Sequence, residues 1–367
     1  MTKLSFAKKQ WQPAIQIVAN AVDKKQLLPA LSSILVRSVA GKLTLTATDL
    51  EIELTAFLPF TEDLVDPFML PAKKFGDILR TMDDDAVVTV EVQKDALYIN
   101  SGLSKFKFTP IAMENFPFIE APPWQQSFDV PKEILTELID STIFAVSQQD
   151  TRIFLNGLLF EGDKDSLTTV GADGHRMAIA SREIALLTDK ERQILPRKAA
   201  QELLRLLNLV DCESIRINLG AALFQAETAD FIFTSKLVDA QYLPYQQAIP
   251  KKSNLFVLAD VEALKRALTR ILIIAEDKSR PLVFDIQGGN LVLLAQNSEQ
   301  EEVKENVEAT IDGPDLRIGL NPLYLLEALN AIKTSVVRLA FYNADTPILV
   351  EPFDDKFYQY IIMPMKI

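Results

Sequence analysis

The sequence predicts an α+β protein made of three similar domains, each with two helices packed on antiparallel sheets. The main observation is an internal repeat, because two positions recur at intervals of 124 residues: Leu43, Leu167 and Leu291, then Asp49, Asp173 and Asn297. Self-similarity at one fixed interval is typical of a repeated structural unit. Two helical patterns and several alternating segments recur in each third of the chain. We therefore predict the same domain three times.

The second helix of each domain is predicted from "LPAKKFGDILRTM", "LPRKAAQELLRLL" and "LNPLYLLEALNAI". Each segment has a proline at the start, where its missing N–H costs nothing. Apolar residues then recur at i, i+3, i+4 and i+7, which is one helical face. These residues are Phe75, Ile78, Leu79 and Met82; Ala200, Leu203, Leu204 and Leu207; Leu325, Ala328, Leu329 and Ile332.

The first helix of each domain has a similar apolar stripe: Trp11, Ala14, Ile15 and Val18; Leu135, Leu138 and Ile139; Leu264, Ala267, Leu268 and Ile271. We expect the middle one to span 131–147. Alternating segments such as 43–46 and 88–90 predict the strands between the helices. Proline and polar residues cluster in "EAPPWQQ" and "AIPKKSN", which predicts domains at 1–122, 123–250 and 251–367.

Composition excludes several classes of protein. The 367 residues are 48% hydrophobic and 24% charged, which is typical of a globular chain. No apolar run is long enough to cross a bilayer, and the start of the chain has no apolar signal core. One cysteine, Cys212, and one histidine, His175, exclude an internal disulfide and almost every zinc, haem or iron–sulfur site, whereas a magnesium or calcium site made of carboxylates alone stays open. We expect no metal, no cofactor and a cytoplasmic location.

The single histidine lies in "VGADGHRMAIA", between Gly174 and Arg176. An acid, an imidazole and a guanidinium so close together suggest catalysis, but no nucleophile signature accompanies them. The repeat places Asp49 and Asn297 at the position of Asp173, and such residues commonly begin turns. We therefore predict a turn here and not a catalytic site. Why the middle copy alone carries Gly-His-Arg stays open.

Three other motifs have simple structural interpretations. "QGGN" (287–290) predicts a hairpin turn, since a phosphate loop needs more glycines and a following helix. "DDD" (83–85) predicts a solvated loop more than a metal site. "EQEEVKE" (299–305) fits a partner-binding face and a solvated strand equally well.

The charges are sorted by element, although the formal net charge is −12. Acids concentrate in loops and strand ends, whereas bases concentrate on helices, including Lys73, Lys74, Arg197 and Lys198. Lysine in a first helical turn opposes the helix dipole, which favours acids there. A basic helical face on an acidic protein suggests a ring or groove that surrounds nucleic acid.

The chain resembles the bacterial sliding clamps, the β subunits of DNA polymerase III, along its whole length. The resemblance rests on "TATDLEIEL", "LPAKKF", "LNGLLFE", "ADGHRMA", "LPRKA", "DFIFTSKLVD", "NSEQEE" and "IMPMKI" in one order. It implies that each chain forms half of a head-to-tail ring, a homodimer that encircles duplex DNA without reading sequence. It also implies a non-catalytic processivity factor that binds the replicative polymerase subunit, the clamp loader, and other polymerases and repair proteins through a short peptide motif.

The resemblance also implies site residues. DNA contacts would come from Lys25, Lys73, Lys74, Gln149, Arg152, Arg197 and Lys198. A client-peptide pocket would use Leu155, Gly174, His175, Arg176, Met177, Leu243, Ile361, Met363, Pro364 and Met365. Its rim departs from the family, which usually reads Phe-Pro-Asp-Tyr and then a basic residue, where this chain has Tyr242-Leu243-Pro244-Tyr245 and Gln247.

The subunit interface would join Phe106 and Phe108 to Ile273 and Ile274. Beside this apolar patch, Lys105 and Lys107 would face acids of the partner: Glu301, Glu302 and Glu305. Opposite charges at the two ends favour head-to-tail docking. The alternative function is a triplicated protein-binding scaffold that does not encircle DNA.

Overall fold

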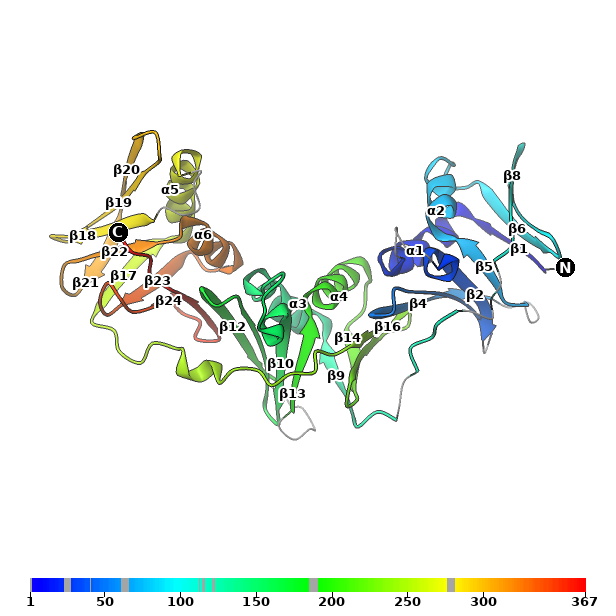
Figure 1. Cartoon of the computed structure of the whole chain (residues 1–367), viewed down its shortest axis with the longest axis horizontal. Coiled ribbons are helices and arrows are strands. Elements are labelled where there is room, and N and C mark those ends of the chain that lie inside the picture. The colour runs from blue at the N-terminus through cyan, green and yellow to red at the C-terminus, as the bar shows by residue number, and fades with distance from the viewer. Residues whose placement is uncertain are drawn as a thin grey trace. The chain divides into compact units, whose positions relative to one another are not determined.

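The structure, a computed structural model, describes residues 2–22, 28–39, 41–60, 66–111, 113, 116–120, 123–184, 191–275 and 281–367. Its internal contacts divide the chain into two compact units. The first unit contains Met1–Lys132 and Gln201–Leu237, and the second contains Glu133–Ala200 and Val238–Ile367 (Figure 1).

The helices of the described residues follow the predicted apolar stripes. They are α1 (Lys8–Val18), α2 (Ala72–Arg80), α3 (Lys132–Asp140), α4 (Arg197–Leu209), α5 (Val261–Ile274) and α6 (Pro322–Ala331). In α1 the whole predicted face is buried, and in α5 it is buried as well. Burial of one face against a sheet is what stabilises an amphipathic helix in a globular protein.

Two antiparallel sheets make up the first unit. In spatial order, the smaller sheet contains β1 (Thr2–Ala7), β6 (Val87–Gln93), β7 (Ala96–Ser101) and β8 (Ser104–Phe108). The larger contains β5 (Phe68–Pro71), β2 (Ser33–Val39), β3 (Lys42–Thr48), β4 (Ile52–Pro59), β16 (Phe231–Lys236), β15 (Leu223–Glu227), β14 (Ser214–Leu219) and β9 (Gln126–Pro131). Helix α1 packs on β4 and α2, and Trp11 meets the ring of Phe75 edge to face at 5.3 Å.

The second unit repeats this plan. Its larger sheet contains β13 (Glu191–Pro196), β10 (Gly157–Asp163), β11 (Ser166–Ala172), β12 (Arg176–Glu183), β25 (Tyr358–Ile362), β24 (Ile348–Pro352), β23 (Val336–Phe341), β17 (Leu255–Asp260) and β21 (Ala309–Asp312). Its smaller sheet contains β20 (Glu302–Val307), β19 (Asn290–Gln296), β18 (Leu282–Gln287) and β22 (Leu316–Leu320). Helix α5 packs against α6 and β20. The α+β prediction with antiparallel sheets is confirmed.

The division into units follows the sheets, because β4 pairs with β16 and β12 pairs with β25. Strands β9 and β14–β16 from the predicted middle domain therefore join the first unit, while β10–β13 join the second. The boundaries at 1–122, 123–250 and 251–367 are not tested by this division and stay a prediction.

One predicted helix is shorter than expected. The helix predicted over 131–147 ends at Asp140, and the short 3₁₀ helix η4 (Ile143–Ala145) follows it. The Thr142 hydroxyl donates a hydrogen bond to the Leu138 carbonyl at 2.7 Å and lies 3.0 Å from the Thr169 hydroxyl. This threonine therefore ties the end of α3 to β11, and the chain leaves the helix there.

Two of the smaller motifs are as predicted. Gly288 and Gly289 join β18 to β19 in a tight hairpin, and both have positive φ (56° and 77°), which glycine adopts without strain. The acidic run 83–85 lies in the exposed turn between α2 and β6. There, Asp84 pairs with Lys8 and Asp85 pairs with Lys9, each at 2.9 Å.

Candidate functional site

The stretch around His175 is a turn closed by its own aspartate. One carboxylate oxygen of Asp173 accepts hydrogen bonds from the main-chain N–H groups of His175 (2.9 Å) and Arg176 (3.0 Å). Asp49 accepts from the second and third N–H groups after it in the same way, and Asn297 closes a turn one residue longer by accepting from the second and fourth. The predicted turn is confirmed in all three copies.

Gly174 has a structural reason to be glycine. Its φ is 88°, in the left-handed region that side chains with a Cβ rarely adopt. A Cβ at this position would lie 2.5 Å from a guanidinium nitrogen of Arg152. The glycine therefore lets the Arg152 side chain lie against the turn, where it also makes two hydrogen bonds to Asp150 at 2.9 and 3.0 Å. This pairing lowers the pKa of Asp150 to about 2.

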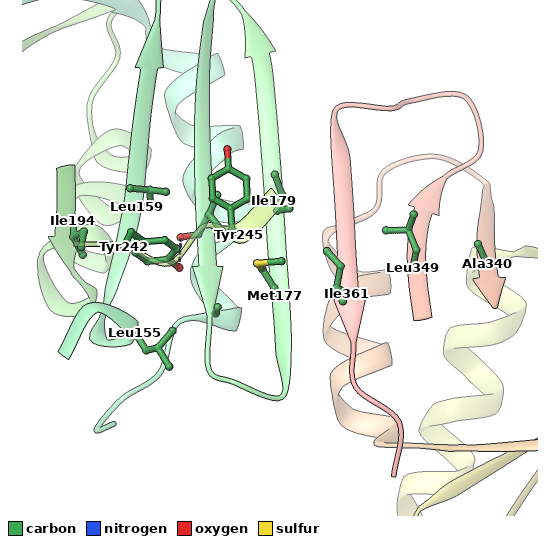
Figure 2. Close-up of a cluster of buried hydrophobic side chains, with 12 residues drawn as sticks. Leu155, Leu159, Met177, Ile179, Ile194, Tyr242, Tyr245, Ala340, Leu349 and Ile361 are labelled. Carbon is green, nitrogen blue, oxygen red and sulfur yellow. Dashed lines mark hydrogen bonds between the residues drawn. The ribbon is translucent and has the colours of Figure 1, made fainter. Parts of the chain in front are cut away.

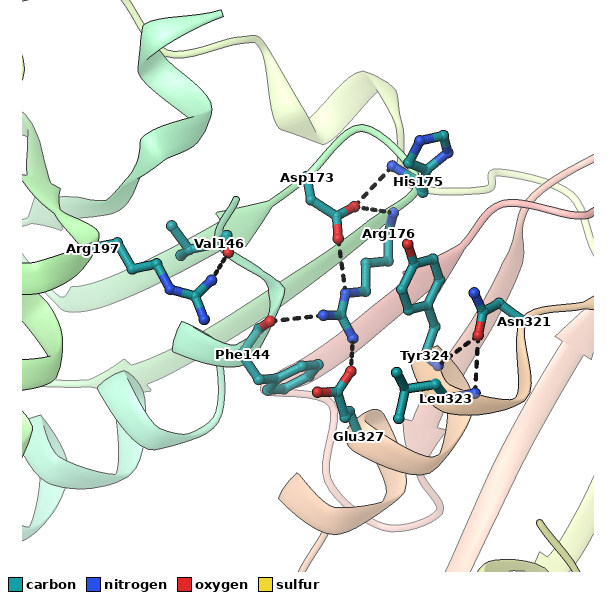
Figure 3. Close-up of polar contacts among 10 residues, drawn as sticks. All are labelled: Phe144, Val146, Asp173, His175, Arg176, Arg197, Asn321, Leu323, Tyr324 and Glu327. Carbon is teal, nitrogen blue, oxygen red and sulfur yellow. Dashed lines mark hydrogen bonds and ion pairs between the residues drawn. The ribbon is translucent and has the colours of Figure 1, made fainter. Parts of the chain in front are cut away.

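The contacts of Arg176 explain why the middle copy has an arginine at this position. Its side chain is only 10% exposed and reaches three elements at once (Figure 3). It donates to Asp173 within its own turn (3.0 Å), to the Phe144 carbonyl in η4 (2.8 Å) and to Glu327 on α6. The guanidinium also lies 4.4 Å from the ring centroid of Tyr324. Arg176 thus fastens the β11–β12 turn to α6.

Replacing Arg176 with alanine is expected to destabilise the protein by about 2 kcal/mol or more, because two partly buried carboxylates lose their cation. For a chain of 367 residues, that corresponds to a fall in melting temperature of roughly 3 °C. Arg176→Lys keeps the charge but cannot reach all three partners, so an intermediate loss is expected. Thermal melting of the three proteins measures this, and an unchanged midpoint in the alanine variant would contradict the role.

A large apolar pocket opens beside this turn. Its volume is about 820 Å³, and its floor includes Leu155, Ala172, Met177 and Ile361. These floor residues belong to a buried cluster that also contains Tyr242 and Tyr245 (Figure 2). The Tyr242 hydroxyl donates to the Val170 carbonyl at 3.2 Å, and burial raises the pKa of this phenol. A concave, mainly apolar cavity with a few polar groups is typical of a binding site.

Sheet pairing brings the two ends of this pocket together. Met177 on β12 lies opposite Ile361 on β25, although 184 residues separate them in sequence. After β25, the Met363 N–H donates to the His175 carbonyl at 2.9 Å, and the Met365 N–H donates to the Gly319 carbonyl at 2.8 Å. The C-terminal tail is therefore fixed against the His175 turn on one side and against β22 on the other.

Most of the predicted pocket residues line this cavity. The residues that line it are Leu155, Gly174, Arg176, Met177, Leu243, Ile361 and Met363, whereas His175, Pro364 and Met365 do not. The His175 ring is exposed (Figure 3), and its main chain contacts the tail. Gln247, expected at the rim, lines it as well. The pocket prediction missed Arg152, Phe154, Ala172, Ala248, Ile249, Pro250, Lys251, Lys252, Tyr342, Thr346 and Pro347.

The first repeat shows why the pocket needs the second copy's residues. At the position of Met177 it has Glu53, whose carboxylate accepts a hydrogen bond from the Ile119 N–H at 3.0 Å. Partial burial raises the pKa of Glu53. A partly buried carboxylate, bonded to the Ile119 N–H, occupies the position of Met177 in that copy.

The predicted DNA-contact residues lie at several places. Lys73 and Lys74 are exposed in the first turn of α2, and Lys198 is exposed at the start of α4. Gln149 lies in an exposed turn before η5 (Ile153–Asn156), whereas Arg152 lines the apolar pocket. Lys25 lies outside the described residues.

Arg197 is less accessible than a DNA contact would suggest. It is half-buried and donates to the Val146 carbonyl (Figure 3). Burial, and then the nearby Arg176, lower the pKa of its guanidinium. Its side chain would have to turn outward before it could contact a phosphate.

The predicted interface residues lie on sheet edges and at a helix end. Strand β8, with Lys105, Phe106 and Phe108, is an edge strand in the first unit, and β20 is an edge strand in the second. Ile273 is 68% exposed near the end of α5, and Ile274 beside it is partly exposed. Glu301 accepts from the Asn297 amide, whereas Glu305 is paired with Arg270 at 2.6 and 2.7 Å.

Metal-ligand clusters and membrane-spanning helices do not occur in the part of the chain that the structure describes. Its residues contain no group of three or more His, Cys, Asp or Glu side chains that could hold a metal ion. Within the same ranges, no helix has the length and apolar character required to span a membrane.

The helix-on-sheet repeat and the apolar pocket define the DNA clamp fold. Models of the N-terminal, central and C-terminal domains of the DNA polymerase III beta subunit match residues 2–120, 129–244 and 246–366. The chain is 36% identical to the beta sliding clamp of Pseudomonas aeruginosa over 356 residues, and 33% identical to that of Escherichia coli over 360 residues, with 96% of each chain covered in both cases.

Solved structures agree with these matches. A sliding clamp of Pseudomonas aeruginosa bound to griselimycin superposes with a TM-score of 0.95 at 33% identity, covering all of both chains. The beta subunit of Thermotoga maritima superposes with a TM-score of 0.92 at 26% identity, again over all of both chains. The chain therefore belongs to the DNA polymerase III beta subunit family, the bacterial beta sliding clamps.

Proposed function

We propose that two copies of this chain close head to tail into a ring that encircles duplex DNA. The ring tethers the replicative polymerase and other clients without catalysing a reaction, and a clamp loader places it on DNA. The observation that carries this proposal is the match of three successive domain models along 2–366. Domains at 1–122, 123–250 and 251–367 and a cytoplasmic location belong to the same proposal.

The exposed edges support ring closure. An unpaired edge strand readily adds a strand from another chain, and β8 and β20 are both edge strands. Leu103, in the turn before β8, is fully exposed, and Ile273 on α5 is largely exposed. Because the two edges differ, a contact between them is heterologous, and it closes into a ring when the rotation between subunits divides the circle.

The helices support contact with DNA. Lys73 and Lys74 lie in the first turn of α2, which has no acidic residue, and Lys198 lies in the first turn of α4, which has none either. Backbone N–H groups at a helix start favour anions such as phosphate, and lysines there add charge. Contacts to phosphate carry no sequence information, so such a surface can hold DNA and still slide.

The apolar pocket supports client binding. It is large enough for several side chains of an extended peptide, and Met177 and Met363 can adapt to different partners. Of the predicted residues, we assign seven to its lining: Leu155, Gly174, Arg176, Met177, Leu243, Ile361 and Met363. We assign His175, Pro364 and Met365 to the adjoining turn and C-terminal tail.

Replacing Lys73, Lys74 and Lys198 by alanine is expected to weaken DNA binding equally for all sequences. The slope of log affinity against log salt should fall by roughly 0.9 for each phosphate that the protein no longer neutralises. Titration of labelled duplexes between low and moderate salt measures this slope. A matched control replaces Lys94, Lys164 and Lys356, which lie in turns outside the helices, and should leave the slope unchanged.

Encirclement itself is tested by loading the protein on nicked circular DNA. A closed ring should remain bound in high salt and leave when the circle is cut. If the protein washes off the circle as readily as off the linear form, the scaffold without encirclement is the better function.

A further inference from the structure

The mouth of the apolar pocket carries positive charge on an acidic protein. Four cations line the cavity, namely Arg152, Arg176, Lys251 and Lys252, and none of the described Asp or Glu side chains does. The formal net charge of the whole chain is −12. The charged side chains that line the pocket are therefore opposite in sign to the net charge of the chain.

Two of these cations are already neutralised. Arg152 makes two hydrogen bonds to Asp150, and Arg176 pairs with Asp173 and Glu327. The other two, Lys251 and Lys252, are exposed and have no ion pair within the described ranges. They directly follow Ile249 and Pro250, whose side chains form part of the apolar wall. We call Lys251 and Lys252 the basic lip.

We propose that the basic lip recognises a carboxylate of the bound client peptide and so makes the pocket selective for acidic clients. This inference rests on the proposed peptide-binding function. An apolar anchor held in the pocket keeps the adjoining part of the peptide within reach of the two ammonium groups. The attraction between the carboxylate and the two ammonium groups is strengthened by the neighbouring apolar wall, where the dielectric constant is low, and it is weakened by salt.

The carboxylate has two possible sources, an aspartate or glutamate next to the anchors, or the free C-terminus of the client. Both present the same group to a lysine. An exposed ion pair contributes at most about 1 kcal/mol, so we expect a preference of about two- to fivefold at low salt.

The test uses labelled peptides with a glutamine, leucines and a terminal aromatic residue as shared anchors. One pair differs by aspartate or asparagine before the anchors, a second by aspartate or asparagine after them, and a third by a free or amidated C-terminus. Affinities are measured by fluorescence anisotropy at low and high salt. The full-length protein is compared with Lys251→Gln/Lys252→Gln and with the control Lys94→Gln/Lys164→Gln, which removes the same charge elsewhere.

The expected result is tighter binding of at least one acidic peptide by the unaltered protein and by the control. The lip variant should lose this preference, high salt should reduce it, and the fully neutral peptide should bind all three proteins equally. The pair that shows the preference identifies the source of the carboxylate. An acidic preference that is absent, or that persists in the lip variant, overturns the proposal. Failure of the neutral peptide to bind the unaltered protein would instead contradict the proposed pocket function.

Discussion

Replacing Phe106 and Ile273 together by alanine is expected to leave the chain monomeric at micromolar concentration. Phe106 lies on the edge strand β8, and Ile273 is an exposed apolar residue on α5. If both are buried when two chains meet, each truncation costs about 2–5 kcal/mol. Their sum weakens association about a thousandfold or more. Sedimentation at several concentrations measures the change.

A matched control distinguishes this interface from a general loss of exposed apolar surface. Val39→Ala/Phe353→Ala also removes one exposed apolar side chain from each unit, but outside the proposed interface. This control should sediment as the unaltered protein does. If the Phe106→Ala/Ile273→Ala variant is a dimer as tight as the control, the interface lies elsewhere.

The second large effect is expected from removing the C-terminal tail. Deleting Met363–Ile367 removes the Met363 wall of the pocket and the two hydrogen bonds that hold the tail to His175 and Gly319. Extended peptides gain most of their affinity from a few buried anchors, and losing an anchor's site commonly costs about 2 kcal/mol or more. Client-peptide affinity should therefore fall by about 30-fold or more. Anisotropy titration of the labelled peptide measures it.

Two further variants make this test specific. Deleting only Lys366–Ile367 leaves Met363 and the Met365–Gly319 hydrogen bond in place, so it should keep peptide binding. Met177→Ala alters the opposite wall and should reduce peptide affinity as the longer deletion does. All three variants should still form dimers and be retained on nicked circular DNA. Full peptide binding by the longer deletion would show that the tail is not part of the site.

The repeated fold could be predicted from the sequence because each of its signals is local. A helix that buries one face must repeat its apolar residues every three or four positions, and the stripe through Trp11 and Val18 does so. An Asx residue before a strand can close its own turn, as Asp49, Asp173 and Asn297 do. The helix predicted over 131–147 was too long: it ends at Asp140, and beyond it Thr142 contacts Thr169 on β11, a partner that a local apolar period does not indicate.

The prediction of the pocket residues depended much more on the resemblance to a family than on the chemistry of the residues. Nothing in the spacing of Met177 and Ile361 indicates that they are neighbours, and only the pairing of β12 with β25 makes them so. The same pairing brings Met363 to His175. The rim residues Tyr342 and Lys251 were missed for the same reason, since they belong to connecting segments that reach the pocket only in the folded chain.

By itself, then, the sequence determined the threefold α+β repeat, its helices and its turns, because burial of one face imposes a period on each local segment. The tertiary structure alone decided what the side chains of the middle copy do. It directs Arg176 to Glu327 and the Phe144 carbonyl, turns Arg197 toward the Val146 carbonyl, and leaves Lys251 and Lys252 exposed at the mouth of the pocket. These contacts involve residues far away in the chain. The spacing of apolar residues within one segment does not indicate them.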